Sequence, residues 1–184
     1  FKKSYEMIVN AGFSNINIDT MFGIPNQNLK SFENTLDEVL KLSPTHISSY
    51  SLIIEEGTPF YNMELPLPSE SEERDMYEML KEKLKEYERY EISNFAKPGY
   101  ECKHNLKYWT MKDYLGLGLN SHSFIDNERF SNTSSLEEYK ELIKNGNKPL
   151  DIIEKEDSAE LLKDTIITGL RLSDGININE INKK

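Results

Sequence analysis

The sequence predicts an α/β protein, and three consecutive segments near its start carry that prediction. Residues 15–19 (Asn-Ile-Asn-Ile-Asp) alternate strictly between polar and apolar side chains, which is typical of a half-buried strand. Apolar residues at helical spacing follow over residues 32–40, and Pro44 ends that predicted helix. Residues 47–54 are β-rich and almost uncharged, as expected of a strand buried on both faces. The order strand, helix, strand is the βαβ unit of a parallel sheet.

Further helices and one more strand are predicted along the rest of the chain. Ser69 and Glu72 have the spacing of a capping box and should begin a helix. Residues 90–95 are predicted to form a third strand, and two helices should begin after Ser135 and Asp157.

The two ends of the chain both fall inside predicted helices. Residues 5–10 form a helical pattern closed by Gly12, and residues 177–180 begin a new helix shortly before Lys184. We therefore expect the sequence to be an excised piece of a longer protein.

Composition excludes several classes of function. The chain has 184 residues and a formal net charge of −10, a sign that opposes binding to nucleic acids and to anionic lipid surfaces. No apolar run approaches the ~18 residues that a transmembrane segment needs. A single cysteine excludes an internal disulfide framework and agrees with a reducing compartment, so we expect a cytoplasmic protein.

The segment 104–109 (His-Asn-Leu-Lys-Tyr-Trp) concentrates chemically distinctive side chains. It contains one of three histidines and the only tryptophan, and the preceding Pro98 and Gly99 predict a loop. An imidazole beside two large aromatic rings suits a flat, metal-bearing ligand such as a porphyrin, with His104 as a ligand of the iron. On composition alone the simpler interpretation is a hydrophobic loop plug in which His104 is only hydrogen-bonded.

A polar row is predicted on one face of the first strand. Asn15, Asn17 and Asp19 alternate with isoleucines and so share a face. Amide and carboxylate groups at the carboxyl end of a parallel strand are placed to bind hydroxyl or ammonium groups of a ligand. The alternative is a hydrated or internally hydrogen-bonded row without a ligand.

Two closely spaced glycines mark residues 114–124. Gly116 and Gly118 begin like a dinucleotide-binding fingerprint, but Ser121 and the absence of a following helix exclude that motif. The glycines instead indicate backbone that comes close to a ligand or to a neighbouring strand. His122 either faces the same site or is an ordinary polar residue of a strand.

Several of these motifs resemble those of one protein family. The segments are 17–27, 50–59, 90–109, 114–118 and 130–133. Together they resemble radical S-adenosylmethionine proteins of the oxygen-independent coproporphyrinogen III oxidase group, and in particular its HemW branch of haem chaperones. The resemblance implies the second part of an open (β/α) barrel over residues 1–130, followed by a mainly helical, truncated C-terminal region over residues 131–184.

The resemblance also implies roles for individual residues. Asp19 would contact S-adenosylmethionine from the end of its strand, and Ile53 would line the same pocket. His122 takes the place of a further pocket residue, although the oxidases proper carry an apolar residue there. The His-Asn-x-x-Tyr-Trp motif of the haem site falls on His104, Asn105, Tyr108 and Trp109, with His104 as the iron ligand. The resemblance thus favours haem binding over the plug interpretation.

The implied function is haem binding and trafficking toward haem-accepting proteins, within porphyrin metabolism. The alternative is a fragment of a true coproporphyrinogen III oxidase, which decarboxylates two propionates with S-adenosylmethionine. The chain has only four arginines for a tetracarboxylate substrate, and this counts against the alternative.

The chain departs from the family in its cysteines. The family holds a [4Fe–4S] cluster with three closely spaced cysteines, whereas this chain has Cys102 alone, so we expect it to be catalytically inactive. Exposed edges of a partial barrel would favour a homodimer.

Overall fold

The computed structural model describes residues 1–155 and 157–181, which form two compact units. The first unit is Phe1–Glu101 and the second is Cys102–Lys184. This division differs from the domains predicted at 1–130 and 131–184, because one antiparallel sheet of the second unit runs from His122 to Lys155 and so crosses residue 130. No helix within the described ranges is long and apolar enough to cross a membrane.

The first unit contains a four-stranded sheet in the order β1-β2-β4-β3. These strands are β1 (Asn17–Phe22), β2 (His46–Ser51), β4 (Asn94–Ala96) and β3 (Glu88–Arg89). β1 and β2 are parallel, which confirms the predicted βαβ unit, and β4 is antiparallel to β2.

The third predicted strand, over residues 90–95, is shorter than expected. Regular strand structure begins only at Asn94. The buried Glu91 carboxylate accepts hydrogen bonds from the Ser93 backbone, at 2.9 Å, and from the Asn94 side chain. These contacts accompany a bend at residues 92 and 93, which interrupts the extended structure before Asn94.

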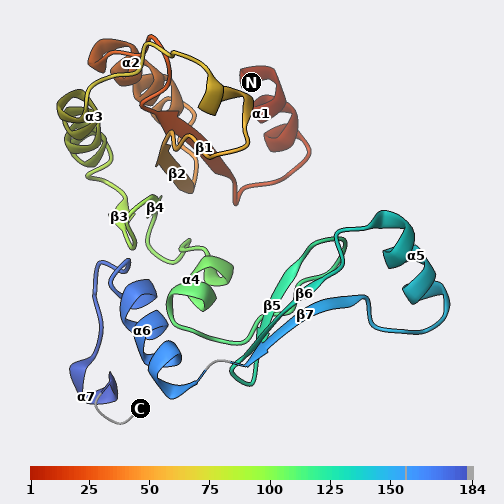
Figure 1. The fold of residues 1–184 in the computed structure, drawn as a ribbon. Coiled ribbons are helices and arrows are strands. Elements are labelled where there is room, and N and C mark those ends of the chain that lie inside the picture. Colours follow the sequence, from red (N-terminus) through yellow and green to blue (C-terminus); the bar gives the residue numbers. More distant parts are fainter. Residues whose placement is uncertain (156, 182–184) are drawn as a thin grey trace. The chain divides into compact units, whose positions relative to one another are not determined.

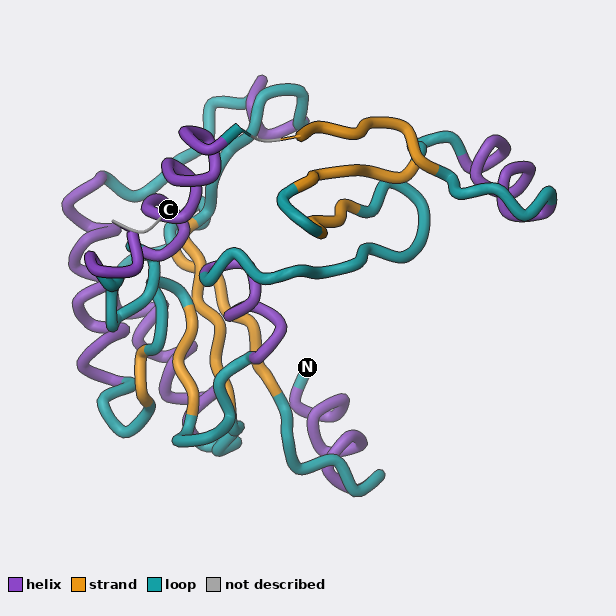
Figure 2. The backbone as a smooth tube through the Cα atoms, turned by 90° about the horizontal axis from the view of Figure 1, so that it is seen from below, coloured by secondary structure: helices purple, strands orange, loops and turns teal. Residues whose placement is uncertain are grey.

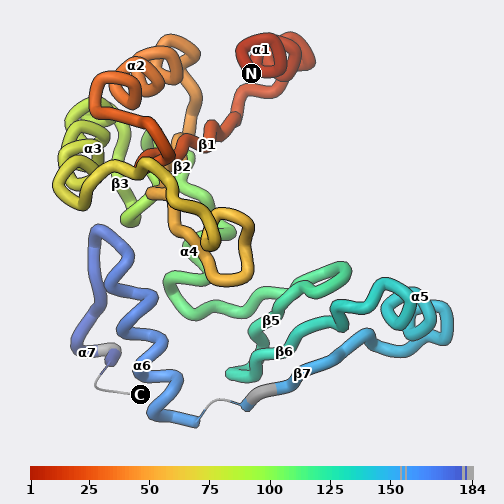
Figure 3. Tube along the Cα trace, turned by 45° about the horizontal axis from the view of Figure 1, so that its top comes forward, coloured from red at the N-terminus to blue at the C-terminus, as the bar shows by residue number. Residues whose placement is uncertain are grey.

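Helices α2 (Leu29–Leu40) and α3 (Glu70–Lys83) contact each other beside the sheet (Figure 1 and Figure 3). Figure 2 shows the orange strands of this unit next to its purple helices. A capping box joins Ser69 and Glu72 at the start of α3, as predicted. Helix α1 (Lys2–Asn10) and the short 3-10 helix η1 (Pro59–Asn62) complete the unit.

The strict alternation of β1 sorts its side chains between the core and solvent. Ile18, Thr20 and Phe22 are buried, whereas the alternate residues Asn17, Asp19 and Met21 are exposed. Phe32 and Leu36 of α2 are completely buried in the same core. The apolar face of β1 therefore packs on the helices and leaves its polar face open.

In its described residues, the second unit contains a three-stranded antiparallel sheet and four helices. Its strands are β5 (His122–Ile125), β6 (Glu128–Asn132) and β7 (Leu150–Lys155). Asp126 and Asn127 join β5 to β6 with φ of 53° and 64°, as a tight type I′ hairpin requires.

The helices of the second unit are α4 (Lys103–Trp109), α5 (Leu136–Lys144), α6 (Ser158–Gly169) and α7 (Ile178–Ile181). α5 and α6 begin at the predicted caps, and α7 begins at the predicted place. The expected mainly helical region 131–184 thus also contains β7, a strand that the sequence analysis did not identify.

Gly116 lies against neighbouring backbone, as its sequence context predicts. A Cβ atom at this position would lie 2.3 Å from the carbonyl oxygen of His122. Gly118 instead has open space around it and a φ of 104°, in the region that favours glycine. The two glycines therefore serve different purposes.

Replacing Gly116 with alanine should destabilise the second unit by about 1–3 kcal/mol, because backbone atoms must move to admit the methyl group. Urea unfolding followed by circular dichroism measures this loss. The neighbouring Leu117→Ala, at a side chain 83% exposed, is the matched control and should have little effect. Equal stability of the Gly116→Ala variant and wild type would contradict the close approach.

Candidate functional site

The segment that contains His104 is a short helix, so the predicted loop is wrong at this point. α4 runs from Lys103 to Trp109, with Cys102 in extended conformation as its N-cap. Gly99, with a φ of 83°, makes the turn that precedes it. The chain therefore turns at Pro98 and Gly99, as predicted, but becomes helical immediately afterwards. His104 and Tyr108 consequently lie one helical turn apart on the same side of α4.

His104 and Tyr108 are joined by a hydrogen bond and by ring contact. The Nε2 atom of His104 lies 2.8 Å from the Tyr108 hydroxyl, and the ring centroids are 5.0 Å apart at 85°. The Tyr108 ring also meets the Tyr114 ring edge-on at 4.5 Å, and Tyr114 lies 6.3 Å from the buried Phe124. The rings of His104, Tyr108, Tyr114 and Phe124 thus form an aromatic row. The exposed His104 imidazole lies at its outer end, and the buried Phe124 ring lies at its inner end.

Trp109 belongs to a different environment from Tyr108. The Arg171 guanidinium lies 4.2 Å from the centre of the Trp109 ring, which is the geometry of a cation–π contact. Trp109 also lines a cavity of about 160 Å³ together with residues of α6 and of the segment before α7. Its buried Nε1 has no hydrogen-bond partner among the described residues. Asn105 is half-buried in α4. The structure therefore brings His104 and Tyr108 together directly, while Trp109 faces Arg171.

The predicted polar row consists of Asn17 and Asp19 on β1. The Asn17 Nδ2 atom donates to the Asp19 carboxylate at 2.6 Å and to the Ser48 hydroxyl at 3.1 Å. Asn15 lies before the strand and accepts a hydrogen bond from Thr45 instead. Asp19 is the third residue of six in β1, so it does not lie at the strand end as expected.

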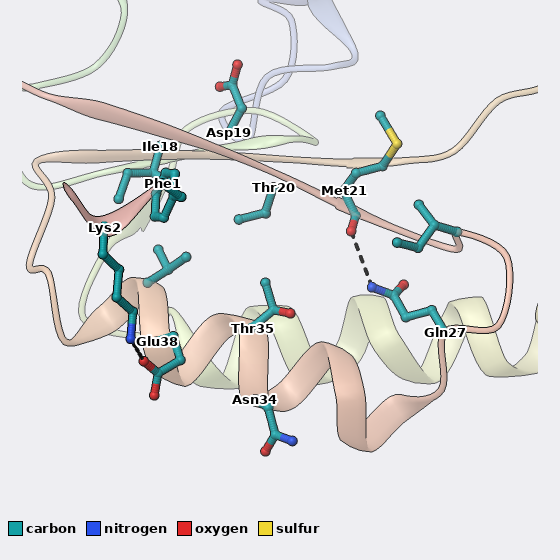
Figure 4. Close-up of a pocket in the computed structure, with 12 residues that line it drawn as sticks. Phe1, Lys2, Ile18, Asp19, Thr20, Met21, Gln27, Asn34, Thr35 and Glu38 are labelled. Carbon is teal, nitrogen blue, oxygen red and sulfur yellow. Dashed lines mark hydrogen bonds and ion pairs between the residues drawn. The ribbon is translucent and has the colours of Figure 1, made fainter. Parts of the chain in front are cut away.

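The carboxylate of Asp19 points away from α2. Figure 4 shows it on the opposite side of β1 from Thr35 and Glu38. A cavity of about 570 Å³ lies between β1 and α2, and residues of both elements line it. Because the carboxylate points away from α2, it is directed toward the open polar face of the sheet.

His46 belongs to this polar face, and the sequence analysis missed it. Its side chain is only 5% exposed. Nδ1 lies 2.7 Å from Asn17 Oδ1, and Nε2 lies 2.8 Å from the Tyr90 hydroxyl. Burial lowers the pKa of His46, and the nearby carboxylates of Asp19, Glu91 and Glu101 partly oppose this shift. Aligning the two predicted parallel strands could have identified His46, since it is the partner of Asn17 in the register of β1 and β2.

The two other predicted pocket residues lie in different units. Ile53 follows β2 in the first unit and is 74% exposed. His122 is the first residue of β5 in the second unit and is also exposed. Both side chains are open to a ligand, and their roles stay predictions.

The residues present do not fit an iron–sulfur cluster. The only cysteine of the chain is Cys102, which is half-buried. Within residues 1–155 and 157–181, no group of three or more His, Cys, Asp or Glu side chains is arranged to hold a metal ion. A [4Fe–4S] cluster needs several thiolates, so this chain does not hold one by itself.

The buried His46 should make the stability of the first unit depend on pH. Its pKa in the folded unit lies below the ordinary value of 6.5, so the unfolded chain binds more protons as the pH falls. The contribution of His46 to the free energy of unfolding should be fully present above pH 6.5. As the pH falls below 6.5, the free energy of unfolding should decline, with a slope of at most about 1.4 kcal/mol per pH unit. Urea unfolding at a series of pH values measures the decline. The non-titrating His46→Asn variant should lose this component, and an unchanged pH dependence in that variant would contradict it.

Comparison with known proteins places these features in context. No protein-family model matches the chain. It is 38% identical over 180 residues to "Heme chaperone HemW" of Bacillus subtilis (strain 168), covering 95% of this chain and 48% of that protein. It is 37% identical over 123 residues to the protein of the same name from Escherichia coli (strain K12), covering 66% and 32%. The chain thus spans about half of the first relative's length and about a third of the second's.

A solved structure shows the same fold. The structure described as "Coproporphyrinogen III oxidase (HemN) from Escherichia coli is a Radical SAM enzyme" superposes with a TM-score of 0.78 and 20% identity. The match covers 97% of this chain and 45% of that one. The α/β fold predicted from the motifs is therefore confirmed. Over nearly its whole length the chain is thus similar in sequence to about half of a HemW-type heme chaperone, and it has the fold of the matching 45% of the coproporphyrinogen III oxidase structure.

Proposed function

We propose that this chain serves in haem trafficking, as part of a haem chaperone of the coproporphyrinogen oxidase-like radical SAM type. The observation that carries the proposal is the exposed His104 imidazole at the outer end of the aromatic row on α4. The names of the relatives support the same function. Haem is here the cargo, which the protein must bind and later release to haem-accepting proteins.

The side chains around His104 suit haem. A neutral imidazole nitrogen is a common axial ligand of haem iron, and the exposed ring is open to an approaching porphyrin. Tyr108 holds Nε2, so ligation through that atom requires the Tyr108 hydroxyl to turn away. The Tyr108 ring then offers an aromatic surface beside the iron. Asn105 and Trp109 complete the proposed site, with Trp109 held by Arg171.

S-adenosylmethionine is proposed to bind in the first unit, beside Asp19 and Ile53. The exposed Asp19 carboxylate suits an ammonium group or the hydroxyls of a ribose. When bound with a reduced cluster, S-adenosylmethionine supplies radical chemistry in this family. The cluster's cysteines are not in this chain, so the chain's own contribution is binding. A homodimer and a cytoplasmic location complete the proposal.

Haem binding through His104 can be measured directly. Haemin titrated into the purified chain should give a saturable shift of the Soret band. His104→Ala should weaken binding at least about tenfold, because the axial ligand is lost. His122→Ala, at another exposed histidine of the same unit, is the matched control and should bind as wild type does. Equal binding by the His104→Ala variant would refute the proposed site.

Anaerobic reconstitution tests the inference about the cluster. The chain incubated with ferrous iron and sulfide should acquire no stable [4Fe–4S] absorbance, because one thiolate per chain is too few. Under reducing conditions it should also leave S-adenosylmethionine uncleaved. A stable cluster at about one per chain would overturn this inference.

A further inference from the structure

We propose that His46 is a positioning residue that, acting through Asn17, fixes the carboxylate of Asp19 for a ligand on the open face of the sheet. No motif assigns His46 a role. The inference deepens the proposed S-adenosylmethionine site and rests on the proposal that Asp19 contacts that ligand.

The hydrogen bonds around Asn17 have one consistent direction. An ionised carboxylate only accepts, so the atom of Asn17 that lies 2.6 Å from Asp19 must be the donating Nδ2. The Asn17 oxygen then faces His46 Nδ1 at 2.7 Å and also accepts from the Ser48 hydroxyl at 3.2 Å. His46 Nδ1 must therefore carry the proton.

The other nitrogen of His46 completes the chain of bonds. With Nδ1 protonated, neutral Nε2 accepts from the Tyr90 hydroxyl at 2.8 Å. The order is thus Tyr90 to His46, His46 to Asn17, and Asn17 to Asp19, each group donating to the next. A single tautomer of His46 satisfies every bond, and the burial of the ring favours this neutral form.

Strand pairing holds the participating residues in place. In the parallel ladder Asn17 is opposite His46, and Asp19 is opposite Ser48. The four side chains therefore share one face of two adjacent strands. The charged groups around His46 are Asp19 from β1, Glu91 from the turn before β4, and Glu101 after β4. None of them replaces the His46 donor to the Asn17 oxygen, because all three are carboxylates.

Without a donor at the Nδ1 position, the Asn17 oxygen keeps only the Ser48 hydroxyl as a hydrogen-bond donor, at 3.2 Å. The Asn17 amide is then held less firmly in the orientation in which Nδ2 donates to Asp19. The Asp19 carboxylate in turn is held less firmly in its position. His46 thus acts on ligand binding through orientation, although it need not contact the ligand.

Two substitutions separate this role from a merely structural one. In His46→Asn the side-chain amide nitrogen occupies the place of Nδ1, so the donor to Asn17 is kept. In His46→Gln the amide reaches the place of Nε2 instead, so the bond to Tyr90 is kept and the donor to Asn17 is lost. Both variants remove the imidazole and leave a neutral amide in a buried site.

Nuclear magnetic resonance of the whole chain provides the first measurement. Wild-type His46 should be the neutral Nδ1–H tautomer, and the Asn17 side-chain amide should give protected, distinct proton signals. These amide signals should persist in His46→Asn and lose their protection in His46→Gln. An Nε2–H tautomer in wild type, or an equally protected amide in His46→Gln, would overturn the proposal. The wild-type tautomer decides the matter even if a variant fails to fold.

Calorimetric titration with S-adenosylmethionine provides the second measurement. His46→Asn should bind within about twofold of wild type, and His46→Gln should bind about tenfold more weakly. Equal affinities of the two variants would count against positioning. Asp19→Asn tests the proposed site separately. If wild type does not bind, or if Asp19→Asn binds equally well, the S-adenosylmethionine site is wrong. The nuclear magnetic resonance result still decides the role of His46.

Discussion

The first unit depends on the parallel pairing of β1 with β2. Side chains along a strand alternate between the two faces, so one fixed register determines both sides of the sheet at once. Ile18 beside Ile47 supplies the core that α2 and α3 cover. Asn17 beside His46 supplies the polar face. A slip of one residue would exchange these two faces, so the core and the polar row are specified together.

In the second unit, the geometry of helix α4 determines which side chains of the aromatic motif lie together. Four residues separate His104 from Tyr108, and one turn of α4 therefore brings imidazole and phenol into contact. Tyr108 and Trp109, adjacent in sequence, diverge around the helix, and their rings are 6.4 Å apart and tilted by 59°. The dense aromatic motif thus divides into an outward-facing pair and a tryptophan held by Arg171. The pair contains the proposed haem ligand, while the tryptophan, also part of the proposed site, packs against α6.

The sequence predicted the elements that local signals specify. The alternation over 15–19 and the capping residues Ser69, Ser135 and Asp157 each depend on contacts within a few residues. α4 was expected to be a loop because Pro98 and Gly99 precede it, and its N-cap Cys102 makes no capping bond that would mark a helix start. β7 is also specified by distant contacts, since its partner β6 lies beyond α5.

The candidate site shows the same limit. His104 and Asp19 are found by motif, because each stands among distinctive neighbours in the sequence. His46 is recognised only when its strand is aligned with β1, because its partner Asn17 is 29 residues away in the sequence. Its other partner, Tyr90, belongs to a third segment of the chain. Polar side chains that are hydrogen-bonded to each other across neighbouring strands leave no periodic pattern in the sequence. Their partners depend on the register of the strands, which only the three-dimensional structure shows.

The position of Trp109 has a practical consequence. It is the only tryptophan of the chain, and it lies in the second unit, whereas the buried Tyr87 and the half-buried Tyr5 and Tyr77 lie in the first. Its ultraviolet emission therefore reports on the surroundings of α4 in the second unit, without any label. Tyrosines occur in both units, so the loss of tryptophan packing can be compared, in one unmodified sample, with the circular dichroism of the whole chain.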